Sequence, residues 1–204
     1  MSESLPEQRL LPLLDALPPE RRDAARNRVA LLEAADRLVN HCGVDAVTMD
    51  AVATEAGVGK GTVFRRFESR EGLMAALLNH SEAEWQAAVM SGPPPLGPGA
   101  GPWERLMAFG RSRLDTTLLH ADLIREAGRA GTRSYAAYSF AAMHVRYLLA
   151  ELGVTGDLPL LATALMAPLE APVLGQQVRI EGLDVDRVHA GWVDLARRVV
   201  RSPS

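Results

Sequence analysis

The chain has 204 residues, of which 48% are hydrophobic and 23% are charged, and its formal net charge is −3. These are ordinary values for a globular protein of one domain or two small ones. They exclude a polycation that coats nucleic acid indiscriminately. The single cysteine, Cys42, can form no internal disulfide. We recognise no signal peptide and no apolar run of about 18 residues that would span a membrane, so we expect a cytoplasmic protein.

The first half of the chain is predicted to be helical after a short arm. Residues 1–19 contain four prolines and are expected to form a flexible N-terminal arm. From residue 20 onward apolar side chains recur at helical spacing as far as Gly43, a residue suited to ending a helix. Thr48 and Ser69 can each cap a further helix. The helices expected here cover about residues 20–42, 48–56, 60–67 and 69–90.

The second half is predicted to be helical as well, beyond a break in the pattern. Residues 91–102 read SGPPPLGPGAGP, which is too rich in proline and glycine for a helix and is expected to be a linker. Helices are expected near residues 103–119, 121–130, 132–152, 158–180 and 184–201. Pro168 and Pro172 should kink the fourth of these. Because no segment alternates with period two for long enough to form a sheet, we predict an all-α fold.

The stretch from Thr48 to Leu73 has the pattern of a helix-turn-helix unit. Small residues at 56–58 supply a tight turn, and a second short helix follows at residues 60–67. In such units the second helix lies in the major groove of DNA. From Gly59 to Arg70 there are four basic residues and one acidic residue, so positive charge is concentrated at that helix. A solvated basic helix face beside a small core is the alternative interpretation.

The letters GVGKGT in this stretch also invite comparison with a nucleotide-binding loop. A phosphate loop places a glycine ahead of its Gly-Lys pair, with four residues between, and a serine or threonine directly after the lysine. Thr54 and Gly61 occupy those two places here. Phe64 stands where a dinucleotide-binding motif has its third glycine, and no strand is predicted ahead of the segment. Both nucleotide-binding motifs are therefore excluded.

Residues 28–78 resemble the N-terminal domain of the tetracycline-repressor (TetR) family of transcriptional regulators. The matching positions lie at fixed spacing along about a quarter of the chain: Thr48, Val52, Ala53, Ala56, Gly57, Val58, Gly61, Thr62, Val63, Phe64, Phe67, Ser69, Arg70 and Leu73. The resemblance implies an N-terminal three-helix DNA-binding domain at residues 20–90, which includes a connecting helix. It also implies a helical ligand-binding and dimerisation domain at residues 103–204.

The resemblance assigns DNA contacts to particular side chains. It implies that Thr48, Thr62 and Arg70 touch phosphates, and that Lys60, Arg65 and Arg66 lie nearest the base edges. Phe64 replaces a common tyrosine and so lacks its hydroxyl group. Arg66 stands where histidine or tyrosine is frequent, which leaves its role open between base and backbone. The candidate DNA-binding residues are Thr48, Lys60, Gly61, Thr62, Phe64, Arg65, Arg66 and Arg70.

The resemblance implies that the second domain binds a small effector, and the composition indicates where. Aromatic and methionine side chains, which suit a cavity lining, are concentrated between residues 103 and 152. We expect a pocket for a small, largely apolar ligand, with His144, Arg125 or Arg146 as a polar anchor. The alternative is that these side chains only fill the core. The candidate pocket residues are Trp103, Met107, Tyr135, Tyr138, Met143, His144 and Tyr147.

The last two predicted helices carry apolar bands that are candidates for a dimer interface. Two such helices from each subunit would form a four-helix bundle around a two-fold axis. A two-fold dimer in turn predicts a palindromic operator in double-stranded DNA. The candidate interface residues are Leu161, Leu165, Leu169, Val173, Val188, Trp192, Leu195 and Val199.

The leading hypothesis is a ligand-responsive DNA-binding regulator, more specifically a homodimeric repressor that its effector releases. An enzyme built on a helical bundle is a weaker alternative, because the five histidines are scattered and no HExxH motif occurs. Asp186 and His189 form the only acid-x-x-His pair, whereas a di-metal bundle needs two Glu-x-x-His pairs. No metal, cofactor or enzymatic activity is therefore expected. A helical adaptor that binds protein is the third possibility.

Overall fold

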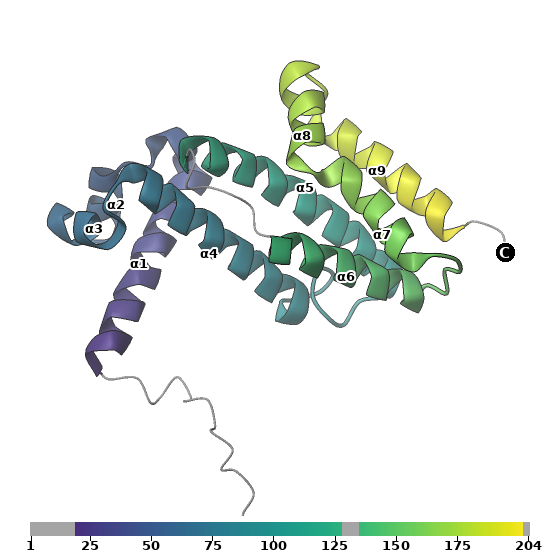
Figure 1. Cartoon of the computed structure of the whole chain (residues 1–204), viewed down its shortest axis with the longest axis horizontal. Coiled ribbons are helices and arrows are strands. Elements are labelled where there is room, and N and C mark those ends of the chain that lie inside the picture. Colours follow the sequence, from purple (N-terminus) through teal and green to yellow (C-terminus); the bar gives the residue numbers. More distant parts are fainter. Residues whose placement is uncertain (1–18, 128–134, 202–204) are drawn as a thin grey trace, which may run out of the picture.

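The structure is a computed structural model, and it describes residues 19–127 and 135–201. Those residues form helices and no strand, which confirms the all-α prediction. The molecule is elongated, with α1 to α3 at one end, α6 to α9 at the other, and α4 and α5 running between them (Figure 1). The predicted arm lies outside the described residues, apart from Pro19.

Three helices and the start of a fourth make up the first end of the molecule. They are α1 (Pro19–Cys42), α2 (Met49–Glu55), α3 (Lys60–Phe67) and α4 (Arg70–Ser91), with a short 3-10 turn, η2 (Val44–Ala46), after α1. Gly43 ends α1 with a positive φ of 82°, a conformation that glycine adopts without steric cost. The side chains of Thr48 and Ser69 accept hydrogen bonds from backbone amides at the starts of α2 and α4, as expected for caps.

The second end is built from α5 (Pro102–Ala127), α6 (Tyr135–Glu151), α7 (Leu158–Met166), α8 (Ala171–Leu174) and α9 (Val185–Val200). The predicted break near residue 120 was wrong, since α5 is continuous. No proline or glycine lies near that position to interrupt it. The expected kink is confirmed, because a 3-10 turn that contains Pro168 separates α7 from α8. A π-helical segment, Gly175–Ile180, follows α8.

Two hydrophobic cores divide the molecule, and α4 and α5 contribute to both. The first core packs α1, α2 and α3 against the first half of α4, and it includes Leu123 near the end of α5. The second core packs Trp85 and Val89 of α4 against α5 to α9. The change of core therefore falls within α4 rather than at residues 91–102. Because α4 and α5 contribute to both cores, they link the packing of the two ends.

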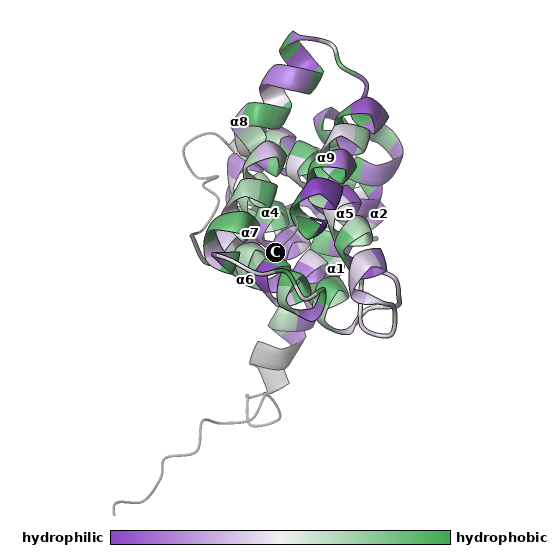
Figure 2. Cartoon of the chain, turned by 90° about the vertical axis from the view of Figure 1, so that its right-hand side faces the viewer, coloured by the Kyte–Doolittle hydropathy of each residue, from purple (hydrophilic) through white to green (hydrophobic). Residues whose placement is uncertain are grey.

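One stretch of the second end bears on the expectation that nothing spans a membrane. Among the described residues, Leu158–Ile180 is long and apolar enough to qualify by length and composition, with a mean hydropathy of 1.5. This is weak evidence, because apolar helices of soluble proteins pass the same test. Here the stretch is broken into short segments, and α7 packs against α6 and α9. Figure 2 shows its hydrophobic character along α7.

Candidate DNA-binding surface and ligand groove

The α2–turn–α3 unit presents one face of α3 to solvent. Gly57 turns the chain with a φ of 66°. Val63 and Phe67 anchor α3 in the first core. Helical spacing therefore directs Lys60, Gly61, Phe64 and Arg65 outward, and all four are exposed. Phe64 is 42% exposed although it is aromatic, so α3 carries an apolar ring in the middle of its basic face.

The basic side chains of α3 differ in how far they are already engaged. Lys60 pairs with Asp50 of α2, Nζ to Oδ1 at 2.7 Å, and its ammonium group lies 5.6 Å from the centre of the Phe64 ring. Arg66 donates from Nη2 to the backbone carbonyl of Ala24 in α1 at 2.6 Å. Arg65 makes no hydrogen bond or ion pair with a described residue. It is therefore the arginine of α3 that can reach outward without breaking an existing contact.

A hollow of about 280 Å³ lies between α1 and α3, beside this face. Arg28, Arg65 and Arg66 line it together with Thr62. Three guanidinium groups around one concave surface favour a phosphate, since arginine donates paired hydrogen bonds in the geometry that phosphate oxygens accept. The guanidinium group of Arg28 also lies 5.2 Å from the centre of the Phe67 ring.

Arg70, to which the resemblance assigns a phosphate contact, is also held by contacts within the chain. Its Nε donates to the carbonyl of Val47 at 3.0 Å, Nη2 donates to the carbonyl of Val44 at 3.4 Å, and Nη1 pairs with Glu126 of α5. Each guanidinium nitrogen thus donates once within the chain. Nη1 and Nη2 each carry a second N–H group, so the phosphate contact stays a prediction. Sequence reasoning had no signal for this arrangement, because Glu126 lies 56 residues away and only the packing of α5 on α4 brings it near.

Replacing Arg70 by alanine is therefore expected to affect folding as well as DNA binding. The substitution removes the donor from two carbonyls and from Glu126, which costs roughly 1–3 kcal/mol of unfolding free energy. Urea denaturation will measure the loss. Arg37→Ala is the matched control, because Arg37 is an exposed arginine with a single ion pair, to Glu55. Equal stability of the two variants would contradict the structural role of Arg70.

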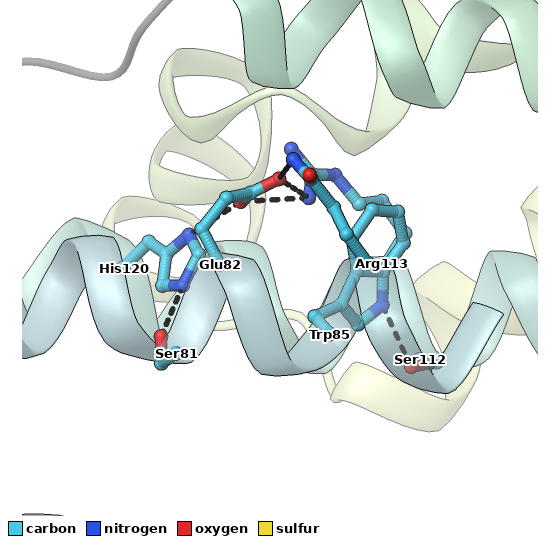
Figure 3. Close-up of polar contacts among 7 residues, drawn as sticks. Ser81, Glu82, Trp85, Ser112, Arg113 and His120 are labelled. Atoms are coloured by element: carbon cyan, nitrogen blue, oxygen red, sulfur yellow. Dashed lines mark hydrogen bonds and ion pairs between the residues drawn. The ribbon is translucent and has the colours of Figure 1, made fainter. Parts of the chain in front are cut away.

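A polar cluster between α4 and α5 joins the two ends of the molecule (Figure 3). Arg113 of α5 is fully buried, pairs with Glu82 of α4 at 3.2 Å, and stacks 4.4 Å from the centre of the Trp85 ring. His120 lies between Ser81 and Glu82, and burial lowers its pKa while the Glu82 carboxylate opposes that shift. Sequence reasoning missed this cluster. The signal was available, because Arg113, Thr117 and His120 recur at helical spacing on one face of α5.

The predicted pocket residues fall into two separate places rather than one. Met143, His144 and Tyr147 of α6 line a groove of about 690 Å³, together with Met90 of α4 and Arg105 of α5. Trp103 and Met107 line a different, shallower hollow beside Pro94 and Pro95. Tyr138 packs partly buried against the second core. The side chains of Tyr135 and Arg125 lie outside the described residues.

His144 is the buried titratable group of the groove. It is 7% exposed and lies between two aromatic rings, with its ring centre 5.5 Å from that of Phe109 and 6.4 Å from that of Phe140. Burial, together with the positive charge of Arg105, lowers the pKa of His144 from 6.5 to about 4. The imidazole is therefore neutral at pH 7.

This pKa shift predicts how stability depends on pH. Between about pH 6.5 and pH 4 the folded protein binds fewer protons at His144 than the unfolded chain does, so acidification favours unfolding. At pH 4.5 the lost stability amounts to about 2–3 kcal/mol. His144→Gln should show a correspondingly smaller loss between pH 7.5 and pH 4.5 in urea titrations. Superimposable pH profiles of the variant and the parent would disprove the assignment.

The predicted dimer interface needs correction at three positions. Leu165 and Leu169 are fully buried within the chain, and Trp192 is 3% exposed. The Trp192 indole packs on Gly110 of α5 and donates from Nε1 to the carbonyl of Leu165 at 2.8 Å. These three side chains hold the second domain together and offer no surface to a partner. Val173 is exposed, and four other predicted residues are partly exposed: Leu161, Val188, Leu195 and Val199.

Fold and geometry together define a helix-turn-helix protein with a second, helical domain that holds a ligand-sized groove. Residues 31–77 match the family model of the bacterial regulatory proteins of the tetR family. Residues 31–77 therefore have the DNA-binding domain of this family.

Similar proteins agree with this assignment. HTH-type transcriptional regulators from Staphylococcus aureus, including that of strain USA300, are 38% identical over 53 residues, which is 26% of this chain. The matched region spans only 29% of the length of those relatives. They are named as transcriptional regulators and not as enzymes, in line with what we expect for this chain.

Solved structures share the fold over most of the chain. A TetR-family regulator from Pectobacterium atrosepticum is 20% identical, with a TM-score of 0.61 over 90% of this chain and 99% of that one. A second from Streptomyces coelicolor is also 20% identical, with a TM-score of 0.59 over 87% and 95% of the two chains. A third structure, a putative regulator from Saccharomonospora viridis in complex with choline, has a TM-score of 0.57 at 20% identity over 85% and 96%.

Proposed function

We propose that this protein is a cytoplasmic transcriptional repressor that binds a palindromic operator as a homodimer and is released by a small effector. The observation that carries the proposal is the outward face of α3, where Arg65 stands free beside Lys60 and Phe64 on a helix anchored by Val63 and Phe67. Arginine and lysine are the usual partners of guanine O6 and N7 in the major groove. The tetR-family match at residues 31–77 supports the same interpretation.

The arrangement of the helices supports control by a ligand. The groove touches the end of α4 through Met90 and the start of α5 through Arg105. The opposite end of α4 begins at Arg70, two residues after the C-terminal cap of α3. A ligand that binds one position of these helices better than another shifts the population towards that position. The two recognition helices of a dimer would then no longer match successive major grooves. The solved relative with bound choline supports a small molecule as the effector.

Selection of bound duplexes from a random DNA pool will test the proposal. The protein, without added effector and at low salt, should enrich a palindrome with half-sites about one helical turn apart or slightly more. Its affinity should fall steeply as salt rises, because each phosphate contact releases counterions. A helical adaptor that binds protein would enrich no sequence, and that result would overturn the DNA-reading hypothesis.

The proposed dimer rests on the apolar side chains that remain exposed on the second domain. Leu160 is 66% exposed, Val173 39% and Ile180 74%, which leaves apolar surface for a partner to cover. Val173→Glu should convert the dimer to a monomer in analytical ultracentrifugation, because the new carboxylates would face each other across the two-fold axis. The unfolding temperature of the variant monomer should differ little from that of the parent monomer, because a surface substitution usually changes stability little. An unchanged dimer would place the interface elsewhere.

A further inference from the structure

The groove at α6 combines an apolar wall with buried polar atoms that lack partners. Met90, Met143 and Tyr147 are each about half exposed or more, at 59%, 53% and 49%, and all three line this groove. Its volume of about 690 Å³ falls within the range of roughly 300–1,000 Å³ that is usual for small-molecule sites. A flat partner surface would leave such a concavity empty, whereas a small molecule would fill it.

Two buried nitrogen atoms belong to residues that line the groove. His144 Nε2 and Arg105 Nε are both buried and neither has a hydrogen-bond partner among the described residues. Buried polar atoms are nearly always paired. Arg105 Nε is a donor, and His144 Nε2 is a donor when it carries the imidazole proton, so an acceptor group on a ligand could pair with both. The Arg105 charge lies close enough to His144 to lower the pKa of its ring, which places both groups together. A neutral imidazole carries one N–H and can donate it to an anion.

The charged residues that line the α6 groove are all positive. Arg105 and Arg146 are its charged residues, and no carboxylate belongs to the lining. Two cations in a lining that contains no carboxylate attract an anion and repel a cation, and the surrounding low-dielectric side chains strengthen both effects.

We propose that the α6 groove binds an amphipathic carboxylate, whose head group accepts hydrogen bonds from Arg105 and His144 and pairs with Arg146. Its apolar body lies along Phe140, Met143 and Tyr147. This inference rests on the proposed function, because it specifies the ligand class of the effector site. The occupant is one small molecule per chain.

Calorimetric titration of the full chain with three ten-carbon probes will test the charge requirement. Decanoate is the anion, 1-decanol is its uncharged counterpart and decyltrimethylammonium is the cation, each used below the concentration at which it aggregates. Decanoate should bind at least tenfold more tightly than the alcohol, since hydrogen bonds to charged groups are the strong ones. The cation should not bind. Equal binding of decanoate and decanol, tighter binding of the cation, or binding of none of the three would overturn the proposal.

Single substitutions test whether decanoate binds in the α6 groove. Arg105→Gln should weaken decanoate at least tenfold and leave decanol unchanged, because it removes a head-group contact only. Met143→Glu, at a position that is 53% exposed, should abolish decanoate binding by charge repulsion. Arg111→Gln is the matched control on the same helix, since Arg111 pairs with Asp115 and Asp186 outside the groove. Undiminished decanoate binding in Arg105→Gln would overturn the assignment.

Two further measurements distinguish this ligand site from a dimer interface at the groove and from the proposed regulatory function. If Met143→Glu turns a dimer into a monomer and the parent binds no decanoate, the groove is an interface between copies and the inference fails. Operator binding is measured independently of decanoate. A protein that binds its operator but not decanoate refutes the ligand class and leaves the proposed regulator intact. One that binds decanoate but enriches no DNA sequence refutes the regulator and leaves the ligand site standing.

Discussion

Replacing Arg65 by alanine is expected to lower affinity for the selected operator more than any other single change on α3. Arg65 is exposed on the outward face and makes no hydrogen bond or ion pair with a described residue, so its guanidinium group is available to a guanine. A good bidentate contact discriminates by roughly 1–3 kcal/mol, and a dimer would lose it in both half-sites. Fluorescence anisotropy with the selected duplex should therefore show a loss of at least about thirtyfold.

The matched control for Arg65→Ala is Arg37→Ala, which removes the same charge from α1 of the same domain. Equal loss of affinity in both variants would show that net charge alone attracts DNA and that Arg65 reads no base. Repeating the selection with Arg65→Ala should also relax the preference at one position of each half-site. Lys60→Ala should have a smaller effect, because Lys60 must first leave Asp50 before it can reach DNA.

Gly110→Ala is expected to be among the most destabilising small substitutions in the second domain. A methyl group on Gly110 would lie 2.0 Å from the Trp192 ring, so the indole that fixes α9 on α5 would have to move. Overpacking of this kind costs about 1–3 kcal/mol. Trp192→Ala, which empties the same contact, should cost about 3–5 kcal/mol. Urea denaturation of each variant will measure both losses.

The double variant Gly110→Ala, Trp192→Ala tests whether the loss of stability in Gly110→Ala comes from the contact with Trp192. In the Trp192→Ala background the new methyl group has room, and alanine is a better helix former than glycine by about 1 kcal/mol. Gly110→Ala should therefore become neutral or stabilising once Trp192 is removed. An undiminished loss in the double variant would show that the cost has another origin than the Gly110–Trp192 contact.

The first half of the protein was largely predictable from its sequence because its signals are local. Caps, turn residues and helical spacing act within a few positions, so Thr48, Gly57, Val63 and Phe67 could be assigned to their places in the helix-turn-helix unit directly. The outward direction of Arg65 follows from the same spacing. What spacing could not show is that Arg66 and Arg70 are held by distant backbone and by Glu126, since those partners are brought near only by folding.

In the second half the sequence indicated helices, a kink at Pro168, and His144 with Met143 and Tyr147 as neighbours on one helix. It could not separate an apolar side chain that faces the core from one that faces a partner or a ligand, because both produce the same periodicity. Tertiary packing decided those cases. It buried Leu165 and Trp192, left Val173 exposed, and brought Arg105 of α5 beside His144 of α6, which gave the groove its positive charge.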